Sequence, residues 1–474
     1  MFPHMPPFLQ TFCSLLLLLE VCFTQAPPSQ PPSDPVQRAV QFSRAHRYKE
    51  AAAALHGVAP PVDGPRRISF FRLRASIESG LGQSSAAALD MEAAAKLAPE
   101  NLDLQVAASL AHLVAQLDSH VSPAQSLDAL RNFRLPDDKE LQLRLQMAET
   151  LTRANLFAEA AKDFAAASSL APRRADIFFN LALAHFQDGD LDAAMTSAER
   201  AKSVEDSASL ESLLGDIQER RGDSLAAVHS YQAAVTLEPS VEQHHLVLAR
   251  ELLTHQTFDA AIVVLEQSAQ IFPQSARVKI LLGLTYYVVD RSTDSIRSLL
   301  EATQLDPKDD LTFRYLGEIT LEDTATPNPA AVSRVCAFAD SHPSSGTANA
   351  LCGGILLRVA EDNGDASHRP EILRRLQRAA RIAPKDALAR CQSGRAFEWS
   401  GQWAAARVQL ENCIQLDPES PEAHYHLARV YRRLGLTALA DQQTARQQQA
   451  AQGKSEESAR RNNTVTKFLV LINH

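Results

Sequence analysis

Apolar residues recur along most of the chain at intervals of three and four, which places their side chains on one face of an α-helix. In the segment 175–206, Leu181, Ala182 and His185 share one face of a first predicted helix. Gly189 and Asp190 then interrupt the pattern, because both residue types favour turns over helix interiors. The face of a second helix is marked by Leu191, Ala194, Ala198 and Ala201. The segment therefore predicts an antiparallel hairpin of two closely packed helices.

This hairpin pattern returns along the chain with a period of about 34 residues in its regular parts. Most periods close with a short phrase in which a small residue and an aliphatic pair precede a proline. Asp206 takes the place of the proline in one period. The closing prolines are Pro99, Pro172, Pro239, Pro273, Pro307, Pro384 and Pro418. One such hairpin cannot bury its apolar face alone, so we expect the hairpins to stack on one another.

The repeated phrases resemble the tetratricopeptide repeat (TPR) family, in its bacterial type, over residues 35–449. The resemblance implies an all-α fold, a right-handed α-solenoid of about twelve helix-turn-helix hairpins. The chain departs from the family at the tryptophan near the start of the first helix of each hairpin. Phe71, Phe178, Phe313 or a non-aromatic residue such as Lys279 stands there instead.

Changes in composition and in the regularity of the repeat divide the chain into seven segments. These are a predicted signal peptide (1–26), a proline-rich linker (27–35), partly degenerate N-terminal repeats (36–140), a regular array (141–309), repeats with long inserts (310–386), C-terminal repeats (387–450) and a polar tail (451–474). We expect the inserts at 322–345 and 359–372 to project as long connections. The tail ends in an apolar run, residues 468–472, which either folds back on the last hairpin or binds a partner.

The N-terminus carries an apolar block, FCSLLLLLEVCF at residues 12–23, followed by small residues up to Ala26. This pattern predicts a secretory leader, and the block is short for a membrane span, which needs about 20 apolar residues. No basic residue precedes the block, Glu20 interrupts it, and Pro27 follows Ala26. We expect a periplasmic or secreted protein with no transmembrane span in the mature chain. The alternatives are an uncleaved leader that tethers the protein to a membrane, and a cytoplasmic protein with a misassigned start codon.

The charge balance and the cysteines narrow the possible ligands. A formal net charge of −9 argues against nucleic acid, whose binding needs a basic face. No cysteine pair has the C-x-x-C spacing of a metal or redox site, and we expect no metal and no cofactor. Outside the leader the cysteines are Cys336, Cys352, Cys391 and Cys413. They could form disulfides in an exported protein or remain four small buried apolar residues.

Catalytic motifs are missing from the sequence. There is no G-x-S-x-G elbow, no phosphate-binding G-x-x-x-x-G-K-[ST] loop and no H-E-x-x-H zinc helix. We therefore predict no catalytic residues and a protein that is not an enzyme, with an enzyme of unrecognised site as a remote alternative.

The resemblance to the TPR family implies that the first helix of each hairpin lines a concave groove for peptides. Asn180 occupies a place where family members often use an asparagine amide to hold a peptide backbone. The same asparagine could also be an ordinary solvated residue. The residues expected in the middle of the groove are Phe179, Asn180, Leu183, Phe186, Arg250, Ile280, Leu284 and Tyr287.

Toward the C-terminus the expected groove becomes basic, with Arg395, Tyr425, Arg429, Arg432 and Arg433 on its inward face. Guanidinium groups beside an aromatic ring suit a carboxylate, which they can bind through paired hydrogen bonds. An acidic segment or a free C-terminus is thus one expected ligand. The alternative is a solvated helical face whose arginines pair with the acidic residues Glu398, Glu411 or Glu422.

These features predict a non-enzymatic scaffold or adaptor of the cell envelope that binds peptide segments of partner proteins in the groove. The alternative is a structural component of an envelope or secretion complex that docks through its convex surfaces and inserts.

Overall fold

The computed structural model describes residues 34–323 and 325–452, and every element in these ranges is an α-helix. The chain divides into two compact units, Met1–Asp206 and Ser207–His474. The predicted leader, nearly all of the proline-rich linker and the apolar run at 468–472 lie outside the described residues.

The helices of each unit are as follows. The first unit contains α1 (Pro35–Arg44), α2 (Tyr48–Leu55), α3 (Gly64–Gly80), α4 (Ser84–Lys96), α5 (Leu102–Asp118), α6 (Ala124–Arg131), α7 (Asp137–Arg153), α8 (Phe157–Leu170), α9 (Ala175–Asp188) and α10 (Leu191–Val204). The second unit contains α11 (Ala208–Arg220), α12 (Ser224–Leu237), α13 (Glu242–Thr254), α14 (Phe258–Ile271), α15 (Ala276–Val288), α16 (Ser292–Leu305), α17 (Asp310–Glu322), α18 (Pro329–Ser341), α19 (Gly346–Asn363), α20 (Arg369–Ile382), α21 (Ala387–Trp399), α22 (Trp403–Leu416), α23 (Pro421–Arg433) and α24 (Thr437–Gln452).

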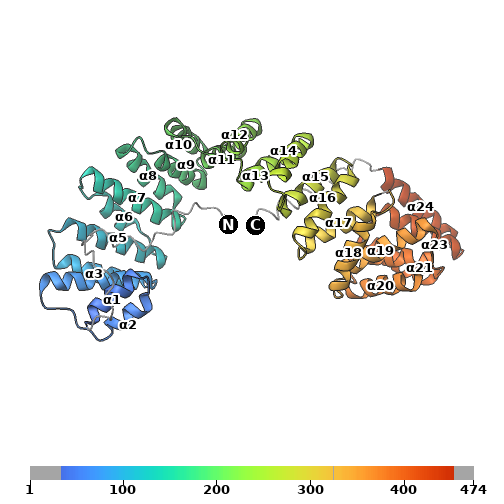
Figure 1. Cartoon of the computed structure of the whole chain (residues 1–474), viewed down its shortest axis with the longest axis horizontal. Helices are drawn as coiled ribbons and strands as arrows, with labels where there is room; N and C mark the ends of the chain where they lie inside the picture. Colours follow the sequence, from blue (N-terminus) through green and yellow to red (C-terminus); the bar gives the residue numbers. More distant parts are fainter. Residues whose placement is uncertain (1–33, 324, 453–474) are drawn as a thin grey trace. The chain divides into compact units, whose positions relative to one another are not determined.

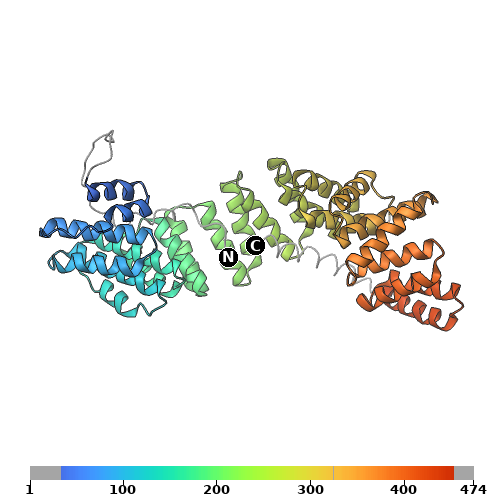
Figure 2. The same cartoon turned by 90° about the horizontal axis from the view of Figure 1, so that it is seen from below.

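Successive helices pair into hairpins, from α1 with α2 to α23 with α24, and neighbouring hairpins stack within each unit (Figures 1 and 2). The 24 helices of the described residues make twelve such pairs. The predicted all-α fold of repeated helical hairpins is therefore confirmed. In the second unit one cluster of buried apolar residues runs through several hairpins, from Ala227 to Ile355.

The turn inside a hairpin forms where glycine and aspartate were expected to break the helix. Gly189 ends α9 with a φ of 90°, a left-handed conformation that glycine adopts without steric cost. The carboxylate of Asp190 then accepts a hydrogen bond of 3.0 Å from the backbone N–H of Ala193 and caps α10. Gly222 and Asp223 build the same turn between α11 and α12.

The closing prolines mark the ends of the second helices. Helix α8 ends at Leu170, just before Pro172, and α22 ends at Leu416, just before Pro418. The residue that precedes a proline is sterically driven out of the α conformation, so the helix stops there.

The prediction of long inserts at 322–345 and 359–372 is wrong. Helix α18 fills most of the first range, and α19 continues through the start of the second as far as Asn363. Pro329 lies in the first turn of α18, where its missing N–H costs nothing, and the side chain of Asn328 caps that helix. Residues that suggested a loop are thus helix-start signals, and the remaining connections in these two ranges are short and follow Glu322, Ser341 and Asn363.

Candidate functional site

Three of the four basic residues predicted near the C-terminus, Arg429, Arg432 and Arg433, lie on one exposed face of α23. Ser420 caps this helix by accepting a hydrogen bond of 3.3 Å from the N–H of Ala423, and Pro421 occupies its first turn. The opposite side of α23 is buried against its neighbours, with Leu427 and Tyr431 in the core. Helical spacing therefore turns one set of residues to solvent: Tyr425, Arg429, Arg432 and Arg433.

Three of these arginines meet at a pocket of about 210 Å³. The guanidinium of Arg433 lies 5.7 Å from the centre of the Trp403 ring, and that of Arg429 lies 5.5 Å from the Tyr425 ring. Arg432 donates a hydrogen bond of 2.7 Å to the hydroxyl of Thr444 on α24. The pocket is lined by Glu398 of α21, Trp403 of α22, and Arg429, Arg432 and Arg433 of α23.

The charge of this pocket is positive on balance. Glu398 is its one carboxylate, 5% exposed, and it pairs with Arg429 at 3.1 Å and with the Nδ1 atom of His426. Among the described residues, Arg432 and Arg433 form no ion pair with a carboxylate. Two of the three guanidinium groups are therefore available to an anion, in a place where an aromatic ring lies beside them.

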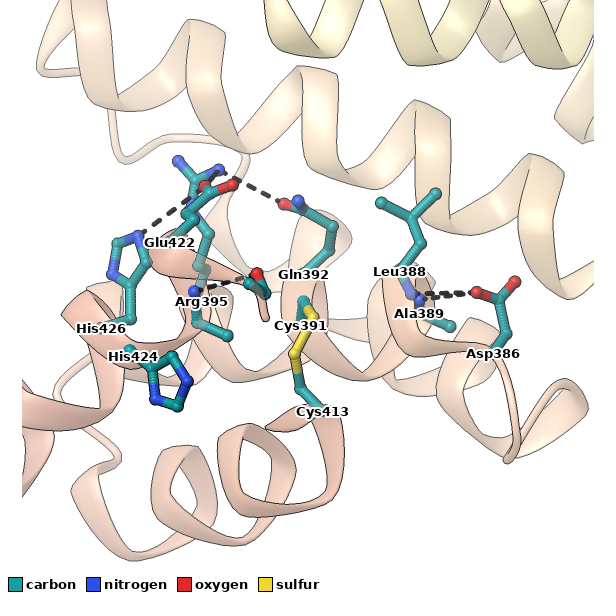
Figure 3. The surroundings of a disulfide bond; sticks show 12 residues. Asp386, Leu388, Ala389, Cys391, Gln392, Arg395, Cys413, Glu422, His424 and His426 are labelled. Atoms are coloured by element: carbon teal, nitrogen blue, oxygen red, sulfur yellow. Dashed lines mark hydrogen bonds and ion pairs between the residues drawn. A yellow bond between two sulfur atoms is a disulfide. The ribbon is translucent and has the colours of Figure 1, made fainter. Parts of the chain in front are cut away.

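Arg395 was predicted beside the other arginines on the inward face of the groove, but it is not part of this pocket. Its side chain is 12% exposed and is held between two carboxylates, Glu361 at 2.8 Å and Glu422 at 2.7 Å. Figure 3 shows Arg395 with Glu422 and His426 on one side and Gln392 on the other. Because its charge is already neutralised, Arg395 positions the neighbouring hairpins rather than awaiting a ligand.

Two of the three acidic residues named in the alternative, Glu398 and Glu422, pair with these arginines. Glu422 pairs with Arg395, and Glu398 pairs with Arg429. Glu411 instead binds Arg407 at 2.8 Å and accepts a hydrogen bond of 2.7 Å from the hydroxyl of Tyr431. Burial and this carboxylate raise the pKa of Tyr431 to about 12, so its hydroxyl stays protonated.

Three of the eight residues predicted for the middle of the groove are buried. Leu284 is 0% exposed, and Ile280 and Phe186 are also buried, which corrects their expected place on an open surface. Ile280 and Leu284 face adjacent helices because α15 carries buried side chains at every position from Ile280 to Tyr286. The other five, Phe179, Asn180, Leu183, Arg250 and Tyr287, are half-buried. The hydroxyl of Tyr287 donates to Glu322. Peptide contact at these positions stays a prediction.

The four cysteines of the second unit are paired, which corrects the alternative of four separate apolar residues. Cys336 of α18 is bonded to Cys352 of α19, and Cys391 of α21 is bonded to Cys413 of α22 (Figure 3). Each bond crosses between neighbouring helices, so its formation depends on how the hairpins pack. The sequence spacings of 16 and 22 residues contain no signal of the pairing.

Other kinds of site find little support in the described ranges. They contain no group of three His, Cys, Asp or Glu side chains that could hold a metal ion. None of the helices described is both long and apolar enough to cross a membrane.

Trp403 is the pocket residue that sequence reasoning missed, although a tryptophan at the start of a helix beside a basic helix could have indicated it.

Comparisons with known proteins agree with the repeated hairpins. A "TPR repeat" profile matches residues 394–435, and a "Tetratricopeptide repeat" profile matches residues 145–209 and 212–276. No curated protein matches the chain.

Several solved structures are similar to the chain at low identity. The C-terminal part of a TPR repeat-containing protein from Cytophaga hutchinsonii is 18% identical, with a TM-score of 0.40, over 60% of this chain and 99% of that one. A thermophilic TPR protein of Thermus thermophilus is 20% identical, with a TM-score of 0.33, over 40% of this chain and 100% of that one. Yeast Tom70 is 13% identical, with a TM-score of 0.33, over 92% and 95% of the two chains. These similarities concern the fold alone.

Proposed function

We propose that this chain, which carries tetratricopeptide repeats at residues 145–209, 212–276 and 394–435, is a non-enzymatic adaptor whose α23 pocket binds an acidic segment of a partner protein. The observation that carries the proposal is the meeting of Arg429, Arg432 and Arg433 at one pocket with a single carboxylate. Arginine binds carboxylates through two parallel hydrogen bonds, which fixes both the position and the orientation of the ligand.

Trp403 and Tyr425 add a second reason for a peptide ligand. Both rings lie beside the arginines, and a ring of this kind also offers apolar contact to a side chain next to the bound carboxylate. The carboxylate that the arginines bind belongs to the partner. It is either the side chain of an acidic residue (aspartate or glutamate) or the carboxyl terminus.

The test is a titration of the full chain with a fluorescent acidic peptide and with the same peptide carrying glutamine in place of glutamate. The variant R432Q/R433Q removes the two arginines that lack a carboxylate partner, and it leaves the Arg429–Glu398 pair intact. We expect this variant to bind at least about tenfold more weakly, since one hydrogen bond to a charged group is worth about 1.5–3 kcal/mol.

The matched control is R134Q/R173Q, which removes two exposed arginines of the first unit and changes the net charge equally. Wild-type binding should weaken as salt rises, because partly exposed charges are screened over about 10 Å at 0.1 M. Equal affinity of the wild type and R432Q/R433Q, or equal loss in the control, would show that the pocket is not the binding site.

We further propose that the protein acts outside the cytoplasm, in the periplasm or as a secreted protein. The two disulfides support this proposal, because such bonds persist in oxidising compartments and are rare in the cytosol. Cell fractionation combined with N-terminal sequencing of the mature chain tests it. An intact N-terminus on a cytosolic protein would contradict the proposal.

A further inference from the structure

Helix α20 carries a row of three exposed arginines, Arg374, Arg378 and Arg381. At 3.6 residues per turn, these positions fall within roughly 60° of one another around the helix axis. The opposite side of the helix bears Ile372 and Leu376, which are buried. The row therefore points away from α19 and α21, the two helices on which α20 packs.

The three arginines have no partner among the described residues, whether an ion pair or a hydrogen bond. Their neighbour Arg375 differs, since it points sideways and pairs with Asp340 of α18 at 2.5 Å. Like charges three and four residues apart on one helix repel each other and destabilise it. The fold gains nothing visible from the row, and a chain of net charge −9 does not need it for solubility.

The row is held on a firm support. The bond Cys336–Cys352 joins α18 to α19 on one side of α20, and Cys391–Cys413 joins α21 to α22 on the other. Arg374 and Arg381 are separated by about 10 Å along the helix, from a rise of 1.5 Å per residue. When the spacing of the three arginines along the helix is fixed in advance, less conformational entropy is lost on binding a partner.

We propose that the outer face of α20 is a second binding surface, separate from the α23 pocket, and that it takes an acidic helix of a partner protein. A helix with carboxylates three and four residues apart repeats the spacing of the three arginines. All three residues are arginine, whose planar fork suits carboxylate groups. The opposed charges of the two helices would bring them together side by side.

Two other anionic partners fit the observations less well. A helix that lies on a lipid surface inserts its apolar face, but the apolar face of α20 is already buried against α19 and α21. A nucleic acid would be repelled by the rest of the chain, because the formal net charge of the protein is −9 even with these three arginines included.

The experiment measures binding of a short helical peptide that has glutamates at three- and four-residue intervals, with a peptide of the same composition in scrambled order as its reference. It uses the full chain carrying R432Q/R433Q, so that the α23 pocket does not contribute. We expect the helical peptide to bind more tightly than the scrambled one. Its affinity should fall about tenfold or more when R374Q/R378Q/R381Q is added.

The matched control adds R44Q/R134Q/R173Q, three exposed arginines of the first unit, and should leave the affinity unchanged. Circular dichroism confirms that each variant is folded. Absence of binding, equal loss in the control, or equal binding of the scrambled peptide would overturn the proposal. Tighter binding of phosphatidylserine vesicles or of a single-stranded oligonucleotide, lost in R374Q/R378Q/R381Q, would overturn the assignment to an acidic helix.

Discussion

Gly283 of α15 faces Leu299 of α16 so closely that a Cβ atom at Gly283 would lie 2.8 Å from the Cγ atom of Leu299. Carbon atoms do not approach to that distance without displacement, so the side chain of Leu299 packs directly on the backbone of Gly283. Two other hairpins have the same contact at the same spacing, between Gly215 and Tyr231 and between Gly394 and Leu410.

A larger side chain at this contact should destabilise the second unit. We expect G283L to lower the free energy of unfolding by about 1–3 kcal/mol or more, because leucine must push α15 and α16 apart. Thermal and urea unfolding measure the effect. The control is G64L, since Gly64 is exposed and a Cβ there meets no atom within 4 Å. A G283L protein as stable as the wild type would contradict the close approach of the two helices.

The first unit contains a buried ionic cluster that gives a second prediction. Asp163 is 0% exposed and binds Arg131 at 2.6 Å and Arg144 at 2.9 Å, which joins α6, α7 and α8. The substitution D163N keeps the shape but removes the anion that the two half-buried guanidinium groups share, so that Arg131 keeps only Glu159 and Arg144 only Glu140. We expect it to cost about 1.5–3 kcal/mol of stability, the range for hydrogen bonds to charged groups.

The control for this prediction is D103N. Asp103 pairs with Lys139 at 2.6 Å, but both side chains are about half exposed. An exposed pair contributes about 0–1 kcal/mol, so D103N should change the unfolding midpoint little. Similar losses of stability in D103N and D163N would show that burial does not govern the strength of the ionic cluster around Asp163.

Glu78 of α3 predicts a dependence of stability on pH. Burial and the negative charge of Asp90 raise its pKa to about 7, against the opposing effect of Arg74. The ordinary pKa is 4.5, so the folded chain binds this proton more tightly than the unfolded chain. The resulting stability is complete below pH 4.5 and is lost as the pH rises from 4.5 to about 7. Neutral glutamine at this position should therefore stabilise the first unit at pH 8 and have little effect at pH 4.

Unfolding midpoints of the wild type and E78Q between pH 4 and pH 8 test this expectation. Glu92 of α4 supplies a control of opposite sign, since its hydrogen bond with Lys96 lowers its pKa. The substitution E92Q should thus give no gain of stability as the pH rises. A constant difference between E78Q and the wild type across the range would contradict the raised pKa of Glu78.

The two disulfides give a fourth prediction. Peptide mapping without reduction should recover Cys336 linked to Cys352 and Cys391 linked to Cys413. Closing loops of 16 and 22 residues stabilises a fold by about 3 kcal/mol each in the chain-entropy description, so a reducing agent should lower the unfolding midpoint of the second unit. A variant with serine at all four positions is the control, because its midpoint should not respond to the reducing agent.

The sequence by itself determined the elements of this protein and their order. Helical periodicity, the turn at Gly189 and Asp190, and the proline that follows most second helices are local signals. Each depends on the conformation of a few consecutive residues, so it can be identified without knowing what those residues contact. The hairpins and the exposed face of α23 followed from these signals.

Only the tertiary structure decided which side chains are available to a partner. Arg395 and Arg432 both appeared as free cations in the sequence, yet Arg395 is neutralised by Glu361, which lies 34 residues away in the neighbouring hairpin. Leu284 likewise looked like a groove residue until packing buried it. Ion pairs, disulfides and burial arise between helices from different parts of the chain. The way the hairpins stack decides which residues meet. A local sequence pattern contains no information on residues that are far apart in the chain.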